Sequence, residues 1–154
     1  MTNDRSFLRT TRRSLPIALL RARETLMAPI REMLGESGVN EQKWRVLRVL
    51  HELGPLELGQ LATEACLLQS SLTRMVKPLE GEGLVTRHTP PEDRRKTVLA
   101  ITEAGVALIL RHSARSADIF ARIEAEFGAE RVELLLNLLD DLQRLDLRKG
   151  GAEP

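Results

Sequence analysis

Apolar residues recur along most of the chain at intervals of three and four, the spacing that gathers them on one face of an α-helix. This pattern predicts long helices over residues 14–35, 40–54, 102–127 and 129–145. Ser14 and Asn40 are the expected N-caps of the first two, because short polar side chains accept hydrogen bonds from first-turn N–H groups. Pro29 predicts a kink or a break in the first helix.

The period of the pattern changes in the middle of the chain. A short helix is predicted over Leu56–Ala62, and another begins at Gln69 after a break around Cys66. Beyond two glycines the sequence becomes β-prone over residues 84–88 and 97–101, with prolines and charges between the two runs. The predicted order is therefore helix, turn, helix and β-hairpin.

The second short helix has an apolar stripe formed by Leu72, Met75, Val76 and Leu79. Its remaining surface carries short polar side chains and then long cations. Such a surface suits a helix that enters the DNA major groove, where the first turn meets base edges and the cations hold phosphates. An ordinary amphipathic helix with a solvated polar face is the alternative. The predicted DNA contacts are Gln69, Ser70, Ser71, Thr73, Arg74 and Lys77.

Pro78 lies inside this helix, where it removes one N–H and crowds the carbonyl of Arg74. The helix is therefore expected either to continue with a bend or to end early, and the place of Lys77 depends on which occurs.

The hairpin tip holds three consecutive cations, which repel one another, so stability alone gives little reason to gather them. A solvated charged loop is the alternative. Beside a polyanion the same cluster is attracted to phosphates or to a narrow minor groove. Asp93 is expected to hold a neighbouring guanidinium through a charge-assisted hydrogen bond. The predicted contacts of the hairpin are Arg87, Asp93, Arg94, Arg95 and Lys96.

Composition excludes several classes of protein. The net charge of the 154 residues is only +1, which excludes a uniformly basic coat, and the absence of tyrosine argues against single-strand binding on stacked aromatics. No nucleophile, phosphate-loop or dinucleotide motif is present, and His51, His88 and His112 are too scattered for a metal site. We expect no enzyme, no metal and no cofactor. One cysteine and no long apolar run predict a cytoplasmic protein.

The last predicted helix is apolar on too many sides to be a free surface element, because leucine occupies positions 134, 135, 136, 138 and 139. A second copy of the chain is the expected cover, which predicts a homodimer. Two-fold pairing would place two recognition helices about 34 Å apart, matching successive major grooves of a palindromic duplex.

The predicted fold class is mainly α with a small β-wing. A winged helix-turn-helix domain is expected over residues 39–101, and a helical dimerisation region over residues 14–36 and 102–148. Residues 1–13 are predicted to be a flexible arm and residues 149–154 a disordered tail.

Asp93-x-Arg95 in the tip and Leu99-x-Ile101-Thr102-Glu103-x-Gly105 after it resemble the MarR family of winged-helix repressors. A closer resemblance, to its homoprotocatechuate-degradation subgroup, rests on Ser14-Leu15-x-x-Ala18-Leu19-Leu20, Glu41-Gln42-x-Trp44-Arg45, Ala65-Cys66-x-Leu68 and Ser71-Leu72-Thr73. The resemblance implies a repressor of aromatic-acid breakdown. It also implies release from DNA when a phenolic acid binds between the dimer helices and the DNA-reading lobe.

An aromatic acid needs an apolar wall and a cation for its carboxylate. Arg13, Ser14, Arg21 and Trp44 meet that need if the first two helices line the cavity. The alternative is that Trp44 belongs to the core and that both arginines pair with the acidic C-terminal helices.

Cys66 lies on an apolar run, which favours a buried packing residue over a reactive thiol. Two other functions remain open beside the ligand-released repressor. One is a repressor switched by oxidation of Cys66, and the other is a winged-helix module used only for protein–protein assembly.

Overall fold

The structure, a computed structural model, describes residues 10–147. Most of the arm predicted over residues 1–13, and the whole tail predicted over residues 149–154, lie outside this range. Within it, Thr11–Arg13 form a 3-10 helix, η2, that leads into α1 (Leu15–Gly35). The chain divides into two compact units, one ending at Ser116 and the other beginning at Ala117.

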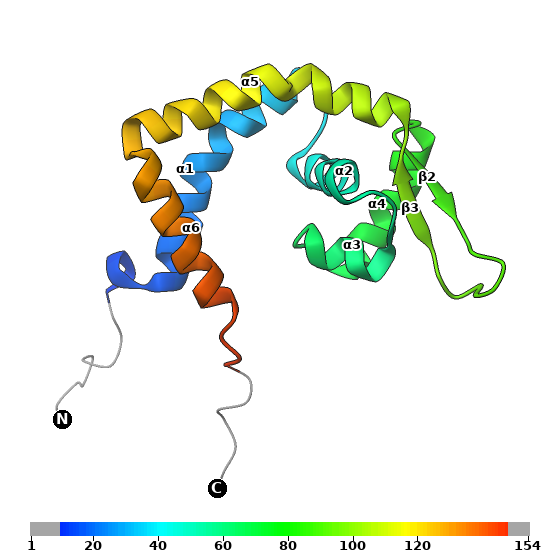
Figure 1. Cartoon of the computed structure of the whole chain (residues 1–154), viewed down its shortest axis with the longest axis horizontal. Helices are drawn as coiled ribbons and strands as arrows, with labels where there is room; N and C mark the ends of the chain where they lie inside the picture. Colours follow the sequence, from blue (N-terminus) through cyan, green and yellow to red (C-terminus); the bar gives the residue numbers. More distant parts are fainter. Residues whose placement is uncertain (1–9, 148–154) are drawn as a thin grey trace, which may run out of the picture. The chain divides into compact units, whose positions relative to one another are not determined.

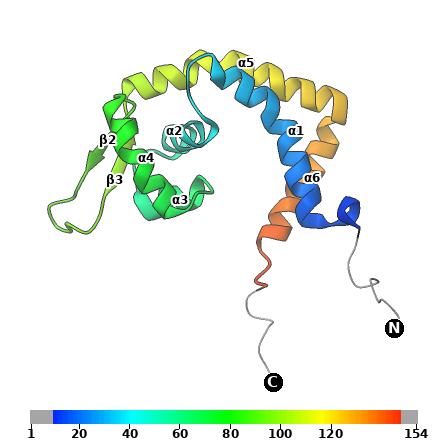
Figure 2. The ribbon, with the colours of Figure 1, turned by 180° about the vertical axis from the view of Figure 1, so that it is seen from behind.

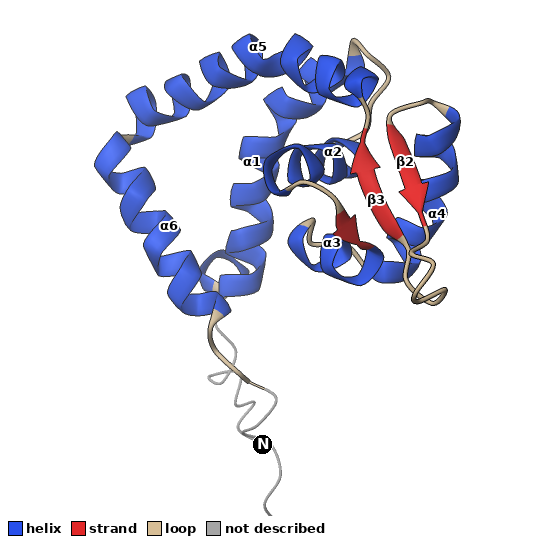
Figure 3. Ribbon diagram, turned by 45° about the vertical axis from the view of Figure 1, so that its right-hand side comes forward, coloured by secondary structure: helices blue, strands red, loops and turns tan. Residues whose placement is uncertain are grey.

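The first unit contains three further helices and a small sheet (Figure 1). The helices are α2 (Glu41–Leu53), α3 (Leu58–Glu64) and α4 (Gln69–Gly81). The strands are β1 (Leu56–Glu57), β2 (Val85–His88) and β3 (Val98–Ile101). All pairing is antiparallel and β3 is central, as Figure 3 shows. The prediction of a mainly α fold with a small β-wing is confirmed.

The second unit holds the C-terminal part of α5 (Glu103–Phe127) and the helix α6 (Ala129–Gln143). Gly128, at a φ of 102°, separates the two helices as predicted. No residue of α6 is buried within the single chain, and its leucines 134, 135, 136 and 138 are 41–58% exposed. None of the helices in the described range is long and apolar enough to span a bilayer.

The helix predicted over Leu56–Ala62 begins two residues later than expected. Leu56 and Glu57 instead form β1, opposite Leu99 and Val98 of β3. The N–H of Leu58 then donates to the carbonyl of Thr97 at 3.0 Å. The prediction was wrong at these two residues because the open edge of β3 offers backbone partners that local sequence cannot reveal.

The fully buried side chains of the first unit come from four helices and one strand. They are Met33 and Leu34 from α1, Val46, Leu47 and Leu50 from α2, Leu61 from α3, Leu72 and Leu79 from α4, and Leu99 from β3. The stripe predicted on the second short helix therefore faces inward, except that Met75 is only half-buried.

The helix boundaries follow the expected caps in most places. Asn40 accepts a hydrogen bond from the N–H of Lys43 at 2.8 Å, and α2 ends before Gly54, which has a φ of 80°. Ser14 occupies the N-cap position of α1, but its side chain makes no capping hydrogen bond. Neither proline interrupts its helix: α1 continues through Pro29, and α4 continues through Pro78 to Gly81.

A rigid turn joins α3 to α4. Cys66 has a φ of 52°, the left-handed conformation, and its N–H donates to the carbonyl of Thr63. The N–H of Leu67 reaches back to the carbonyl of Ala62 at 2.8 Å. These two bonds form a Schellman motif, a helix ending that usually has glycine where this chain has Cys66.

Helix α5 starts against the turn between α4 and β2. The Thr102 hydroxyl donates to the carbonyl of Gly83 at 2.6 Å and accepts from the N–H of Gly105 at 3.1 Å. A Cβ added at Gly105 would lie 2.5 Å from the carbonyl oxygen of Leu84. Glycine at position 105 therefore allows the helix to approach the turn this closely.

Candidate nucleic-acid interface

The polar face of α4 is directed to solvent. Its inner stripe of Leu72, Val76 and Leu79 is buried, so the opposite side of the helix is held outward. Because α4 does not end at Pro78, Lys77 lies on this helix and not on a loop. Of the predicted contacts on α4, Ser71 is half-buried, and the exposed ones are Gln69, Ser70, Thr73, Arg74 and Lys77.

The hairpin of β2 and β3 lies beside α4, and its tip extends beyond the body of the unit (Figure 2). The tip is built by backbone turns, with the Asp93 N–H bonded to the Pro90 carbonyl and the Lys96 N–H bonded to the Asp93 carbonyl. Arg94 and Arg95 are both exposed there.

Asp93 acts differently from the expectation. Its Oδ1 accepts a hydrogen bond from the backbone N–H of Arg95 at 3.0 Å, and not from a guanidinium. The carboxylate therefore shapes the backbone of the tip and leaves the side chain of Arg95 unconstrained by it.

The cations of this surface fall into two groups. Lys96 pairs with Glu57 at 3.0 Å, which raises the pKa of its ammonium, and Arg87 lies 3.5 Å from Glu80. Within residues 10–147, the others form no ion pair: Arg74, Lys77, Arg94 and Arg95. These four charges are available to an external anion without first breaking an internal contact.

A hollow of about 260 Å³ lies between the C-terminal side of the hairpin tip and the start of α4. Gln69 lines one side of it, and Arg95 and Lys96 line another, with Glu57 and Gly59 between them. The fold thus brings the first residue of the predicted recognition helix close to two cations of the hairpin, although 26 positions separate Gln69 from Arg95 in the sequence.

The four predicted effector contacts have different surroundings. Arg13 and Arg21 are exposed, and Ser14 is half-buried. Trp44 is 8% exposed and belongs to the core, with its ring edge-on to His112 at a centroid distance of 5.7 Å. No hydrogen bond or ion pair within residues 10–147 joins any of the four to another.

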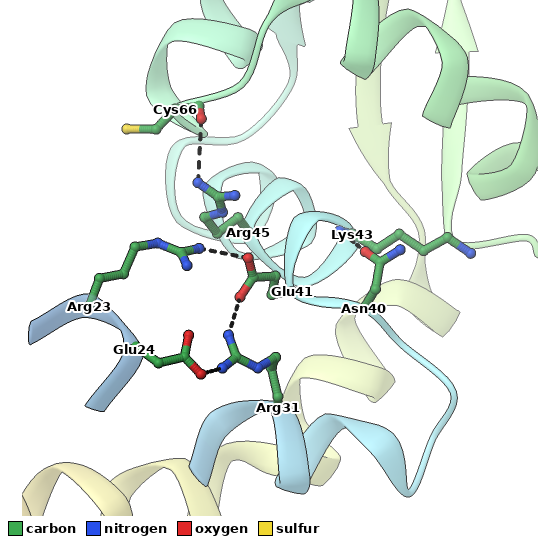
Figure 4. Close-up of polar contacts among 8 residues, drawn as sticks. All are labelled: Arg23, Glu24, Arg31, Asn40, Glu41, Lys43, Arg45 and Cys66. Atoms are coloured by element: carbon green, nitrogen blue, oxygen red, sulfur yellow. Dashed lines mark hydrogen bonds and ion pairs between the residues drawn. The ribbon is translucent and has the colours of Figure 1, made fainter. Parts of the chain in front are cut away.

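Sequence reasoning missed a polar cluster between α1 and α2, drawn in Figure 4. Glu41 accepts from Arg23 at 2.6 Å and from Arg31 at 3.4 Å, and Arg31 also pairs with Glu24. The hydrogen bond from Arg23 is the main cause that holds the pKa of Glu41 below its usual value, against an opposing effect of burial. The cluster therefore ties the first turn of α2 to α1.

His112 was also missed, because nothing in the sequence distinguishes it from the other two histidines. It is 4% exposed, and its Nε2 lies 2.7 Å from the Ser37 hydroxyl, which donates to the carbonyl of Leu34. The Ser37 hydroxyl and the His112 ring therefore share a hydrogen bond just beyond the end of α1. His112 and Trp44 form a small aromatic contact beside the end of α1.

The expectation that Cys66 is buried was wrong, because its side chain is exposed. The left-handed backbone at this residue accounts for the difference: it turns the apolar run so that Ala65 is buried and Leu67 half-buried, while Cys66 faces solvent. The carbonyl of Cys66 accepts a long hydrogen bond of 3.4 Å from Arg45 of α2.

Comparison with known proteins agrees with this geometry. The signature of the MarR family matches residues 39–97, from the start of α2 through the hairpin tip. The homoprotocatechuate degradative operon repressor of Escherichia coli is 38% identical over 83% of this chain and 86% of its own. The transcriptional regulator FarR of Neisseria gonorrhoeae is 36% identical over 86% of this chain and 91% of its own.

A solved structure gives the same result. NadR, crystallised with 4-hydroxyphenylacetate, is 34% identical, covers 90% of this chain and 99% of its own, and superposes with a TM-score of 0.79. The repressor of Escherichia coli and FarR are transcriptional regulators and not enzymes. The exposed polar face of α4, the cationic hairpin and the length of the match together place this chain in the MarR family of winged-helix DNA-binding transcriptional regulators.

Proposed function

We propose that this protein is a cytoplasmic repressor that binds a palindromic DNA duplex as a homodimer and leaves it when a phenolic acid binds. In each protomer α4 enters the major groove, and the hairpin tip reaches the adjacent phosphates or minor groove. The observation that carries the proposal is a set of four exposed cations that form no ion pair with any other residue of the described range 10–147: Arg74, Lys77, Arg94 and Arg95.

Each residue of the DNA surface has a stated role in the proposal. Gln69 and Ser70, on the first turn of α4, meet base edges, and the nearby Ser71 and Thr73 add hydroxyl contacts. Arg74 and Lys77 hold phosphates farther along the same helix. On the hairpin, Arg94 and Arg95 supply the free charge, and Asp93 shapes the tip that presents them. Lys96 and Arg87 must leave glutamates before they can contact DNA.

The homodimer is supported by the apolar residues that the single chain leaves uncovered. Leucines of α6 are half exposed, and so are Leu15, Leu19, Leu20 and Leu26 of α1. Homologues of the MarR family act as dimers. We infer that residues 14–36 and 102–148 supply the interface of this chain as well.

The effector is inferred from two relatives. One represses an operon that degrades homoprotocatechuate, and the other was crystallised with 4-hydroxyphenylacetate. Both compounds are phenols with an acetate arm, so we propose a hydroxyphenylacetate-type acid here. Trp44 would supply the apolar wall, Ser14 a hydrogen bond, and Arg13 or Arg21 the cation for the carboxylate.

DNA binding is tested by selecting duplexes from a randomised library with the full-length protein and measuring their affinity at physiological salt. We expect enrichment of an inverted repeat with nanomolar affinity and a steep salt dependence. Arg95→Ala should weaken binding by at least about tenfold and lower the salt slope by about two, because each protomer of the dimer loses one phosphate contact. Equal affinity for selected and random duplexes would end the proposal.

The effector is tested with the protein's own fluorescence, because Trp44 is the single tryptophan of the chain. Titration with 4-hydroxyphenylacetate should quench this emission and weaken DNA binding over the same concentration range. Arg21→Ala should raise the concentration required, whereas Arg122→Ala, in the acidic C-terminal region, should not. An emission that stays constant while DNA is released would place the effector elsewhere.

A second candidate mechanism is supported by the exposure of Cys66, three residues before the recognition helix. In that mechanism oxidation of the thiol releases DNA, and Cys66→Ser abolishes the response to peroxide. An unchanged response in Cys66→Ser would remove this candidate. The assembly-only alternative predicts that charge reversal at Arg94 and Arg95 leaves function intact, which the DNA-binding measurement decides.

A further inference from the structure

The residue just before the recognition helix is an exposed leucine. Leu68 is the N-cap of α4 and is 74% exposed, more than any other large apolar residue between positions 39 and 101. The next most exposed is Leu53, at 50%, on the last turn of α2. Leu68 therefore stands beside Gln69 and Ser70, which are the residues expected to meet base edges.

Leucine is an unfavourable residue at this position for folding. Serine, threonine, aspartate or asparagine at an N-cap accepts a hydrogen bond from the first turn, whereas α4 has no side-chain cap. An exposed leucine also keeps its apolar surface in water. Stability alone would favour a short polar residue at position 68, so the leucine is explained better by a contact made outside the chain.

The turn before Leu68 holds the backbone that carries its side chain. The Schellman bonds of Cys66 and Leu67 hold the backbone there, and the carbonyl of Leu68 accepts the first helical hydrogen bond from Leu72 at 3.0 Å. Leu67 is half-buried against the protein, and Leu68 is directed to solvent. The apolar group is thus presented on a well-defined backbone at the leading end of α4.

We propose that Leu68 is a specificity-determining residue that packs on thymine 5-methyl groups in the major groove. This inference rests on the proposed DNA binding and goes beyond it, because it assigns a base type to one side chain. Thymine is the base that presents a methyl group in the major groove, and apolar side chains recognise it by contact.

The test removes the methyl group from the DNA and the leucine from the protein. The probe is the duplex that wild-type protein selects from a randomised library, with each thymine replaced singly by deoxyuridine. One thymine per half-site is expected to give a loss of roughly fourfold in wild-type affinity, the effect of burying one methyl-sized group. In Leu68→Ala the same replacement should cost nothing, so the two changes are coupled.

Leu68→Ser tests whether the discrimination of thymine is independent of folding stability. Serine can cap α4, so this variant should melt at a higher temperature than wild type and yet fail to distinguish thymine from deoxyuridine. Leu53→Ala is the matched control, because it removes another exposed leucine and should keep the wild-type discrimination. Leu68→Met, which keeps an apolar side chain of similar size, should also keep it.

The possible outcomes separate the two proposals. Failure to select any duplex would defeat the DNA-binding proposal itself. Tight, selective binding with no thymine sensitive to loss of its methyl group would overturn only the role of Leu68. The role would also be overturned if Leu68→Ala lost the same affinity, relative to wild type, on thymine and on deoxyuridine duplexes. That pattern is expected when the leucine packs on the sugar–phosphate backbone.

Discussion

Helices α4 and α6 both have leucines at helical spacing, but only those of α4 are buried within the single chain. In α4 every residue of the inner stripe except Met75 is buried, with Leu72 and Leu79 at 0% exposure. In α6 no residue is buried, although the helix is rich in leucine. The difference shows that the winged helix completes its core within one chain, whereas α6 has apolar surface that one chain does not cover.

Helix α1 combines the two behaviours. Met33 and Leu34 near its C-terminal end are fully buried in the first unit, whereas Leu15 and Leu20 near its start are more than half exposed. One helix therefore contributes both to the self-sufficient core and to the uncovered surface. The continuous helix α1 therefore joins the uncovered apolar surface to the core of the DNA-binding part.

The largest effect is expected from a charge on the uncovered face of α6. Leu138, which is 56% exposed in the single chain, lies one turn after Leu134 on the same stripe. Leu138→Lys should raise the dissociation constant of the dimer by more than about 100-fold, because two side chains per dimer each lose roughly 1.5–3 kcal/mol of burial. Light scattering across a dilution series measures this directly.

Asn137→Lys is the matched control for that experiment. It adds the same charge to the neighbouring position, where the side chain is already polar and exposed. We expect it to leave the dimer intact. Dimers of equal strength in both variants would mean that the leucines of α6 are not the interface, and the contrast between α4 and α6 would then need another cause.

A substitution in the first unit, whose core one chain completes, should lower the folding stability and leave the dimer intact. Gly105→Ala places a methyl group 2.5 Å from the Leu84 carbonyl oxygen and 2.6 Å from Cγ1 of Ile101. We expect a loss of about 1–3 kcal/mol in the free energy of unfolding, since both neighbours are packed. Chemical denaturation should show this loss while light scattering still shows a dimer.

Gly35→Ala tests whether the effect comes from the close approach and not from the loss of a glycine. A Cβ at Gly35 meets nothing within 4 Å, and the residue lies at the end of a helix with no positive φ. This variant should be neutral or up to about 1 kcal/mol more stable. A similar loss at both positions would contradict the packing explanation.

The parts of the fold that the sequence predicts well are those with local signals. Asn40 caps α2 through a bond three residues away, and the stripe on α4 follows from helical spacing alone. Contacts between distant residues carry no such signal. The edge pairing that converts Leu56 and Glu57 into β1 joins positions more than 40 residues apart. The pairing of Lys96 with Glu57 also joins distant residues. It makes Lys96 less available to DNA than Arg94 and Arg95, which the sequence could not show.

The polar cluster between α1 and α2 offers a test of how α1, which has both buried and uncovered parts, is held to α2. Arg23 lowers the pKa of Glu41 from its ordinary value of 4.5, so the folded state prefers the ionised carboxylate. Its contribution is therefore complete above pH 4.5 and disappears as the pH falls through the lower pKa of the folded protein. Glu41→Gln should cost about 1 kcal/mol at pH 7 and nothing near the acid limit.

Urea denaturation at pH 7 and at successively lower pH measures this difference. Glu24→Gln is the control, because Glu24 is more exposed than Glu41 and, within residues 10–147, forms an ion pair with Arg31 alone. Its effect should be smaller at every pH. A cost of Glu41→Gln that is the same across the whole range would show that shape, and not charge, holds α2 to α1.

The smallest expected effect is a gain in stability, at the turn that presents the recognition helix. Cys66 has a left-handed backbone in a Schellman motif, where glycine carries no steric cost. Cys66→Gly should raise the free energy of unfolding by about 0.5–1 kcal/mol, which is the relief of strain less the added freedom of the unfolded chain. Cys66→Ser keeps the strained backbone and should give no gain, whereas both variants lack the thiol. If both melt higher than wild type to the same extent, the thiol itself is the unfavourable group. If only Cys66→Gly melts higher, the left-handed backbone at Cys66 is the cause of the lower stability. This strain then lies within the first unit and does not depend on the uncovered helices.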